Sequence, residues 1–599
     1  MKERITILLL LVFSLQLILT ASAKDFSRSK KVLAVKLSEK FNLDGKLSES
    51  VYKKQPIGGF VQRDPEEGND ATEPTEVWVS YDSENLYVGA RLYDSNPEAI
   101  DASLMRRDNM IESDWFFVYL DPYLDRRTGY YFGVNPGGSL LDGTLFNDSW
   151  DDNSWDGIWE AKPRIDEKGW TVEMRIPFSQ LRFTESEEMK WGINFNRDIK
   201  RKNEMTYFIM VPKKESGFVS HFATLEGLEG ISQKQRFEVL PYVVQKAQYL
   251  VHDADDPFYG GNQYKTAIGA DFKVGIGSNL NLDATINPDF GQVEVDPAVV
   301  NLSAFETYFQ EKRPFFIEGS NILRFGNIGV NNNWGFNFGD PTLFYSRRIG
   351  RHPQGELPDY DYGSIPHETR ILGAAKLTGK FNESWSLGAV SAVTERTFAK
   401  MKYGDDKFEQ EVEPLSHYGV FRARREFAEG RHALGMIVTS VNRDLGDKKL
   451  KSALVDQAYT FGVDGFTTLD EEDEYVIKAY AIGSYVGGSK EAIQVKQEKP
   501  YRYFQRPDAT YFEYDPDRTS LSGLYSRVML NKQKGDFYIN TALGVVTPGF
   551  ENNDLGFQWM SNKVNGHAVL GYRFFEPYSI FRKSWHYPVS YTHLTLPTN

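Results

Sequence analysis

The chain has 599 residues, no cysteine and a formal net charge of −14, and hydrophobic residues make up 41% of it. Without cysteine, disulfides, cysteine-type zinc sites and thiol catalysis are excluded, and an acidic chain with no basic stripe is not expected to bind nucleic acid. An aromatic content of 14% together with 50 glycines favours β-structure with alternating strands.

The first residues resemble an export signal. Lys2 and Arg4 are followed by the mostly apolar run Ile5–Thr20 and by Ala21–Ala23, which fits an A-x-A cleavage site. The run is too short and wrongly flanked to favour a membrane span, although an uncleaved anchor is the alternative. We therefore expect residues 1–23 to be a signal peptide and the mature chain to begin near Lys24, outside the cytoplasm.

Short strands with turn signals between them fill the next part of the chain. Gly169–Phe178 alternates apolar with polar residues, whereas Asp114–Asp121 is apolar on both faces, as in a central strand of a two-layer structure. No convincing long amphipathic helix interrupts this pattern. Residues 32–230 are therefore predicted to form an antiparallel β-sandwich.

The strand pattern changes near Phe237. Strands of about ten residues alternate small or apolar with polar residues, with tight turns on one side and long polar loops on the other, as in an outer-membrane barrel. Thr266–Gly277 and Leu280–Asn287, for example, form a predicted hairpin. We expect residues 235–588 to form such a barrel in outer-membrane lipid, with the N-terminal domain in the periplasm. A soluble β-solenoid or a second sandwich is the alternative.

The last residues, 589–599, have no continuity with the aromatic strands before them. Their letters, VSYTHLTLPTN, resemble the conceptual translation of a sequencing-library adapter. We therefore expect residues 589–599 to be an artefact, the natural chain to break off near Pro588 and the barrel to be incomplete. A genuine polar tail is the alternative.

Four stretches of the N-terminal part resemble a known module. NLDGKLSESVY, EPTEVWVSYDSENLYVGARLYDSNP, RRDNMIESDWFFVYLDPYLDRRTGYYFGVNPGG and WDGIWEAKPRIDEKGWTVEMRIPFSQLRF are together similar to the sugar-binding β-sandwich of carbohydrate-binding module family 9. Ser113 and Asp114 stand where that resemblance leads us to expect paired aspartates. A contact that needs both carboxylates is therefore not expected in this chain.

The second part resembles the barrel-like domain of unknown function 5916, which often follows such a sandwich in exported proteins of Gram-negative bacteria. The most telling stretches are LNLDATINPDFGQVEVDPAVVNLSAFETYFQEKRPFFIEG and FYSRRIGR. The two resemblances imply an all-β chain, in which an N-terminal antiparallel β-sandwich is followed by an incomplete outer-membrane β-barrel. They imply no activity for the second part, because its family has none established.

The segment WDDNSWDGIW, residues 150–159, holds three tryptophans and three aspartates. Sugars stack their C–H faces on aromatic rings and bond their hydroxyls to carboxylates and amides. Trp150 and Trp155 lie in the most polar part of the loop, so with Asp151 and Asn153 they are the predicted carbohydrate-binding residues. Trp159 leads into a strand and is expected in the core. For each of the other rings, anchoring of the loop is the alternative.

A set of acids is a candidate cation site. Its members are Asp121, Asp125, Asp142, Asp148, Asp151 and Asp152. Calcium takes several oxygen ligands, so we consider calcium as a cofactor, with Asp121 and Asp125 as the metal candidates. Solvated loop acids are the commoner explanation, and turn chemistry in YLDRRTG accounts for Asp125 without an ion.

Asp289, Glu294 and Asp296 lie close together in NPDFGQVEVDP. Glycosidases use two facing carboxylates, but on a strand Glu294 and Asp296 point the same way and would line a barrel lumen. The cations of a salt-bridged lumen would be Arg313, Arg347, Arg348 and Arg351. Zinc, nucleophile and nucleotide motifs are absent from the sequence, and no catalytic residue is predicted.

These observations favour an exported carbohydrate-binding envelope protein that acts in glycan capture or uptake. Two alternatives remain at this point. The chain could belong to a glycoside hydrolase system that cleaves O-glycosyl bonds in carbohydrate catabolism, or it could be a structural envelope protein whose sandwich binds no ligand.

Overall fold

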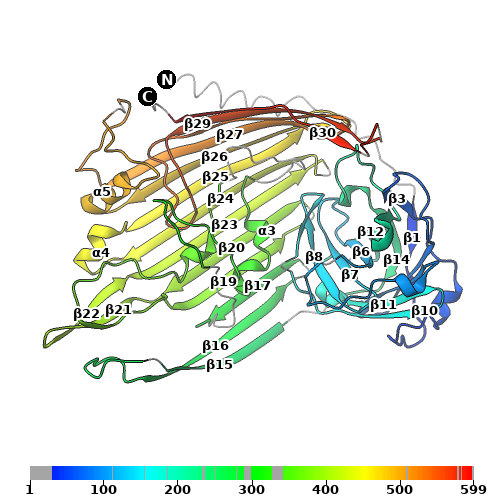
Figure 1. The fold of residues 1–599 in the computed structure, drawn as a ribbon, viewed down its shortest axis with the longest axis horizontal. Coiled ribbons are helices and arrows are strands. Elements are labelled where there is room, and N and C mark those ends of the chain that lie inside the picture. Colours follow the sequence, from blue (N-terminus) through cyan, green and yellow to red (C-terminus); the bar gives the residue numbers. More distant parts are fainter. Residues whose placement is uncertain are drawn as a thin grey trace.

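The structure is a computed structural model (Figure 1). It describes residues 30–110, 112–153, 155–184, 186–232, 237–249, 251–277, 279–288, 298–326, 341–382, 384–428, 430–507, 510–576, 579–581 and 583–595. The expected signal peptide lies outside these ranges. None of the helices within them is long and apolar enough to cross a membrane.

Two facing sheets confirm the predicted sandwich. Their strands are β1 (Lys31–Leu33), β2 (Val35–Lys36), β3 (Val61–Asp64), β4 (Thr75–Tyr81), β5 (Asn85–Tyr93), β6 (Trp115–Asp121), β7 (Gly129–Val134), β8 (Leu140–Phe146), β9 (Trp150–Asp152), β10 (Glu160–Asp166), β11 (Gly169–Pro177), β12 (Glu188–Ile199), β13 (Glu204–Tyr207) and β14 (Ala223–Glu229). One sheet runs β1-β14-β12-β6-β7-β8-β9, with β13 also paired with β12 and β3 paired with β13, and the other runs β10-β11-β5-β4-β2. Among the pairs described, β1–β14 and β2–β4 are parallel and the others antiparallel.

The apolar sequence of β6 is explained by its two covered faces. Phe116, Val118 and Leu120 lie in the core between the sheets. Trp115 and Phe117 lie in a second cluster on the outer face, closed by the segment that precedes β14. Each such side chain contributes roughly 1.5–3 kcal/mol on burial. The prediction that this strand is buried on both faces is therefore confirmed.

The second part of the chain is one long antiparallel sheet. Its strands are β15 (Phe237–Tyr249), β16 (Asn262–Ile276), β17 (Leu280–Ile286), β19 (Ile371–Lys380), β20 (Trp385–Thr394), β23 (Leu415–Phe427), β24 (His432–Asp444), β25 (Gln457–Thr468), β26 (Tyr475–Gly487), β27 (Ser520–Lys532), β28 (Phe537–Val546), β29 (Lys563–Phe574), β30 (Ser584–His586) and β31 (Val589–Thr595). Neighbours in this sheet follow chain order, as in an up-and-down barrel. The predicted β16–β17 hairpin is confirmed.

Short elements lie in the connections of this part. They are the helices α2 (Pro314–Ile317), α3 (Ser320–Leu323), α4 (Lys448–Ala453) and α5 (Lys490–Glu498), and a small sheet of β18 (Tyr362–Ser364), β21 (Thr397–Tyr403) and β22 (Asp406–Glu413). The 3-10 helices of the chain are η2 (Ser50–Lys53), η3 (Pro97–Ala99), η4 (Phe178–Gln180), η5 (Lys200–Lys202), η6 (Val219–His221) and η7 (Ser346–Arg348).

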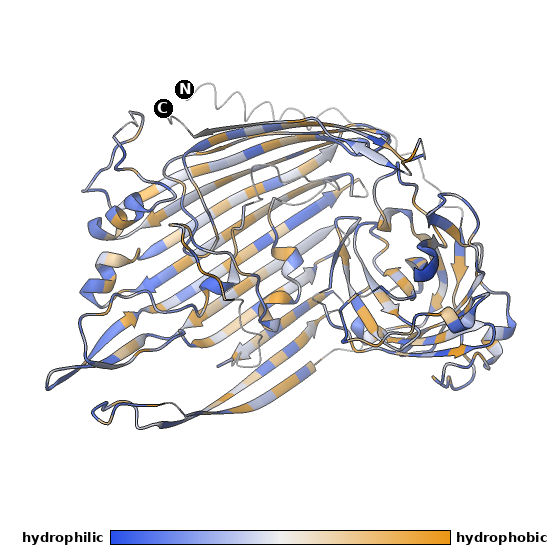
Figure 2. Cartoon of the chain, in the orientation of Figure 1, coloured by the Kyte–Doolittle hydropathy of each residue, from blue (hydrophilic) through white to orange (hydrophobic). Residues whose placement is uncertain are grey.

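In the long sheet, apolar side chains lie on the exposed face and polar side chains on the buried face, which is the reverse of a soluble sandwich. On β25, Tyr459, Phe461 and Val463 are exposed, Phe461 to 52%, whereas Thr460 and Asp464 are buried. Figure 2 shows the same alternation as orange and blue bands along the long strands. Polar residues inside and apolar residues outside are the arrangement of a membrane barrel. The barrel fold predicted from the alternating sequence is thus confirmed.

The barrel is open along one seam. Within the described residues, β15 pairs with β16 alone, and β30 pairs with β29, so the two ends of the strand order do not meet. This agrees with the incomplete barrel that we expected. Residues 589–595, expected to be an artefact, form β31, which pairs with β29.

A segment between β17 and β19 folds against the inner face of the sheet, where Figure 1 shows α3 in front of β20. Leu323 lies against Gly388, and Phe325 lies against Gly462. At either glycine a Cβ atom would come within 2.7 Å of the neighbouring side chain, so both positions require the small residue. The described part of the barrel interior is therefore packed in part by the chain's own apolar side chains.

The two ends of the long sheet differ in their connections. Short turns join β16 to β17, β19 to β20, β23 to β24 and β27 to β28 at one end, whereas the connections that carry α4, α5 and β21–β22 lie at the other (Figure 1). Tight turns on one side and long loops on the other confirm the prediction.

The sandwich packs against the short-turn end. A guanidinium nitrogen of Arg127 donates to the Gly430 carbonyl at 3.1 Å. The Gly535 amide donates to the Lys214 carbonyl at 2.8 Å. Gly430 lies in the turn between β23 and β24, and Gly535 lies in the turn between β27 and β28. The sandwich therefore bridges two hairpins that are distant from each other in the long sheet.

Candidate carbohydrate-binding loop

The loop that carries the predicted sugar site is built on the β8–β9 hairpin. Asn147 and Asp148 turn the chain with positive φ values of 49° and 69°. The Asp148 carboxylate accepts from the amides of Phe218, at 3.0 Å, and Ser220, at 2.7 Å. Its own amide donates to the Arg127 carbonyl at 2.9 Å. These hydrogen bonds hold the turn against Arg127 and the segment 218–220.

Trp150 lies at the edge of the first sheet and is half-buried. Its ring meets the ring of Phe146 edge to face, with 5.7 Å between the centroids and 88° between the planes. Phe146 was not predicted as part of the site. An aromatic residue four positions before a tryptophan, across a tight turn, is the signal that could have identified it, because the two residues pair across the hairpin.

Asp151 and Asn153 are both exposed. Successive side chains of a strand point to opposite faces, and Trp150 and Asp151 are adjacent residues of β9. Asp151 therefore points away from the face that Trp150 shares with Asp152. Asn153 lies three residues after Trp150, just beyond the end of β9. The structure therefore does not bring the Asp151 carboxylate to the Trp150 ring.

Trp159 is more deeply buried in the core than Trp155. Trp159 is 4% exposed and belongs to the core cluster, which confirms its predicted place. Trp155 is half-buried, and its ring lies 5.0 Å from that of Tyr130 and 6.0 Å from that of Phe132. A Cβ atom at Gly157 would come within 2.5 Å of the Trp155 ring. These contacts anchor the loop to the sandwich.

Asp125 makes the contacts of a turn and of an ion pair. Its carboxylate accepts from the amides of Arg127 and Thr128, both at 2.7 Å, and pairs with Lys380 of the barrel. Burial opposes its ionisation, but the ammonium of Lys380 and these hydrogen bonds hold its pKa below the ordinary value. Asp125 thus makes the turn contacts that the segment YLDRRTG suggests, together with an ion pair.

Asp121, the other metal candidate, is fully buried beside it. Its carboxylate accepts from the amides of Asp125, at 3.3 Å, and Arg126, at 2.9 Å. Burial, reinforced by the Asp125 carboxylate, raises the pKa of Asp121 to about 8.

A different group of acids meets in space. One carboxylate oxygen each of Asp108, Asp142 and Asp156 lies within 4.8 Å of the others. Arg107 is among them, 2.7 Å from Asp142 and 3.0 Å from Asp156. Burial, together with the Asp142 carboxylate, raises the pKa of Asp108 to about 6. The guanidinium thus supplies the positive charge that this cluster needs.

The candidate catalytic acids Asp289, Glu294 and Asp296 lie outside the described residues. Ion pairs of the kind predicted for a salt-bridged interior are present. Arg313 lies 2.7 Å from Glu311, and Arg348 lies 2.6 Å from Glu306. Arg347 also donates to the Gln310 carbonyl, and Arg351 donates to the Gln354 side chain.

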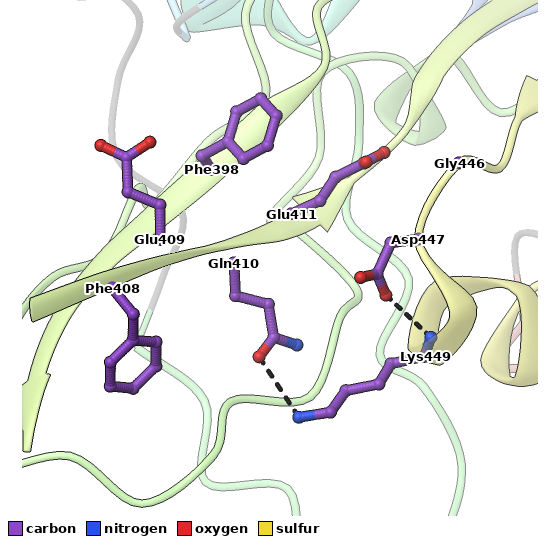
Figure 3. A pocket seen from close by; sticks show the side chains of 8 residues that line it. All are labelled: Phe398, Phe408, Glu409, Gln410, Glu411, Gly446, Asp447 and Lys449. Atoms are coloured by element: carbon purple, nitrogen blue, oxygen red, sulfur yellow. Dashed lines mark hydrogen bonds between the residues drawn. The ribbon is translucent and has the colours of Figure 1, made fainter.

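A pocket of about 440 Å³ opens at the long-loop end of the barrel (Figure 3). Its lining residues are Phe398, Phe408, Glu409, Gln410, Glu411, Gly446, Asp447 and Lys449. The Lys449 ammonium donates to the Gln410 side chain at 3.3 Å, and the Asp447 carboxylate accepts the Lys449 amide at 2.8 Å as the cap of α4. The sequence did not indicate this pocket, because its residues come from separate connections.

Comparisons with known proteins place the second part of the chain in a family. A search among curated proteins finds no match. The family model described as a domain of unknown function, DUF5916, matches residues 234–597, which is more than half of the chain. The chain belongs to the DUF5916 family. The match spans the whole long sheet, from β15 to β31.

Several solved structures are similar to parts of this DUF5916 protein. A carbohydrate binding module family 9 from Caldicellulosiruptor kristjanssonii, in complex with cellotriose, is 16% identical over 34% of this chain and 95% of its own, with a TM-score of 0.25. A putative carbohydrate-binding protein from Bacteroides uniformis is 14% identical over 33% and 99%, with a TM-score of 0.28. The outer membrane channel DcaP of Acinetobacter baumannii is 13% identical over 59% and 91%, with a TM-score of 0.22. Because these scores are low, the function of the DUF5916 protein rests on its own residues.

Proposed function

We propose that this DUF5916 protein is an exported carbohydrate-binding protein of the outer membrane that acts in glycan capture or uptake. The observation that carries the proposal is the Phe146–Trp150 pair on a hairpin held by Asp148. The exposed Asn153 follows Trp150 three residues later in the chain. A half-buried indole on a fixed turn offers a ring for the C–H face of a sugar, and the amide offers partners for its hydroxyls.

The long sheet supports a place in the outer membrane. Large apolar side chains such as Phe461, Leu434 and Leu543 are more than half exposed on its outer face, where lipid would cover them. In barrels of this class the short turns face the periplasm. Since the sandwich packs on the short-turn end, we place it in the periplasm, at the inner mouth of the barrel.

Capture is favoured over free diffusion of solutes. The segment around Leu323 and Phe325 packs inside the described part of the barrel. A solute would have to pass this segment to cross the membrane. The barrel therefore serves first to anchor the sandwich.

The sugar site is tested with Trp150→Ala in the full chain, purified in detergent and applied to a glycan array. We expect wild-type protein to bind a set of glycans and the variant to bind them at least about tenfold more weakly, because the stacking ring is lost. Trp559→Ala, which removes an exposed tryptophan of the barrel, is the matched control and should bind like wild type.

Other outcomes separate the alternatives. If the wild-type chain binds no glycan, the ligand-free structural protein is the better account. If it releases reducing ends from a polysaccharide, the hydrolase account is supported. The membrane location is tested by cell fractionation, where a purely aqueous protein without a heat-modifiable band would contradict it.

A further inference from the structure

The inward segment of the barrel brings a cation to the sandwich loop. The guanidinium carbon of Arg324, the residue that follows α3, lies 5.0 Å from the centroid of the Phe146 ring. The same ring meets Trp150 edge to face. The predicted sugar loop of the sandwich and a residue of the barrel interior thus share one aromatic surface.

The position of Arg324 is fixed by its neighbours. Leu323 and Phe325 are buried on either side of it, while Arg324 is exposed. Its backbone is extended, with φ −62° and ψ 142°, so its side chain leaves the segment on the opposite side from these two. The Gly326 amide then donates to the Asp464 carboxylate at 2.9 Å. The arginine is therefore held facing the sandwich.

Within the described part of the protein, Arg324 contacts the Phe146 ring but has no acidic partner. Other arginines of this region are paired, such as Arg422, which lies 2.6 Å from Asp464, and Arg313 with Glu311. For the guanidinium of Arg324, no hydrogen bond or ion pair is found with any described residue. A guanidinium carries five N–H donors in a planar fork that matches a carboxylate.

We propose that Trp150 and Arg324 form one composite site that selects glycans bearing a carboxylate, such as chains of uronic acids. This inference rests on the proposed function and names its substrate class. The sugar ring would stack on Trp150 while its carboxylate accepts two hydrogen bonds from Arg324, whose plane is oriented by Phe146. Asp151 points away from this face, whereas Asp152 shares it with Trp150, so the Arg324 guanidinium is the group that attracts the carboxylate of the glycan.

The test measures binding of two probes to the full chain in detergent, oligogalacturonate as the acidic glycan and cellotriose as the neutral one. For Arg324→Gln we expect the dissociation constant of oligogalacturonate to rise about tenfold or more, because charge-assisted hydrogen bonds are lost. We also expect its dependence on salt concentration to weaken. Binding of cellotriose should stay within about twofold, since the stacking ring remains. Arg164→Gln, an exposed arginine of β10 in the other sheet, is the matched control.

Two results would overturn the inference, and they are distinguishable. Equal affinity of wild type and Arg324→Gln for oligogalacturonate, with Trp150→Ala weakening both probes, would remove Arg324 from the site and leave the proposed function standing. Absence of binding to either probe, or to any glycan of the array, would overturn the proposed function and this inference together.

Discussion

Glu173 lies on β11 with its carboxylate fully buried on the outer face of the second sheet. It accepts from the amides of Asp44, at 2.9 Å, and Gly45, at 2.8 Å, and from the Tyr52 hydroxyl at 2.9 Å. Burial outweighs these bonds and raises its pKa from 4.5 to about 7. The folded protein therefore holds a proton on Glu173 where the unfolded chain has released it.

The stability of the sandwich is expected to fall as pH rises from about 4.5 to 7, because the folded state binds more protons than the unfolded state in that window. The loss is on the order of 3 kcal/mol. Glu173→Gln should make this dependence shallower by its own share and leave the part due to Asp108 and Asp121, as measured by denaturant unfolding followed by tryptophan fluorescence at several pH values. Glu188→Gln, which changes an exposed carboxylate of β12, should retain the wild-type slope. A wild-type profile that is flat between these pH values would contradict the prediction.

At the scale of single residues, the sequence predicts where the carbohydrate-binding loop lies better than it predicts which residues form the site. Trp159 is in the core as its place just before a strand predicts, whereas the adjacent Ile158 is exposed. Asp151 could not be judged in the same way, since its direction depends on where β9 begins. Arg324 left no signal at all. It lies far from the loop in sequence and reaches it through tertiary packing.

Among the elements, the turn after β6 and the end of β19 are joined by the buried pair of Asp125 and Lys380. Lys380→Met removes the ammonium and leaves the Asp125 carboxylate buried without it. Breaking such a pair costs about 3–5 kcal/mol. We expect faster hydrogen exchange of the amides in residues 121–128, because the sandwich is loosened from the barrel.

The control for this variant is Lys490→Met, which removes the partner of Asp517 in an exposed pair at the long-loop end. Exposed pairs contribute little to stability, so exchange at residues 121–128 should not change. Unchanged exchange in Lys380→Met as well would show that the sandwich is held by its other contacts.

Long strands were predicted well from sequence, and short charged ones were not. The hairpins β19–β20 and β23–β24 follow the alternation that the sequence shows. In β21 and β22, charged residues dominate and the buried set is small, namely Ala399, Met401 and Val412. Such a strand has no apolar face long enough to be identified by periodicity, so tertiary pairing determines it.

At the scale of the whole molecule, the outward apolar face determines where the protein resides. Phe461→Arg places a charge on that face of β25, in the middle of the long sheet. A charge near the bilayer midplane costs about 2–4 kcal/mol on a lipid-facing strand. We expect a smaller fraction of heat-modifiable, membrane-inserted protein after refolding into liposomes.

Ile165→Arg is the control for this variant, because Ile165 is an exposed apolar residue of the sandwich rather than of the barrel. Its insertion should equal that of wild type. If Phe461→Arg inserts equally well, the exposed apolar face of β25 does not contact lipid, and a soluble location of the long sheet would be favoured.

The docking of the sandwich on the short-turn end also sets a sequence of assembly. Lys214 pairs with Asp536, a partner 322 residues later in the chain, whereas the sandwich core joins residues that are all synthesised before β15. Local contacts form early, and contacts of large sequence separation form late. The sandwich can thus mature first, and its contact with the β27–β28 turn requires that this late hairpin of the sheet has formed. Seating would then act as a checkpoint of biogenesis, visible as delayed protection of the surface around Lys214.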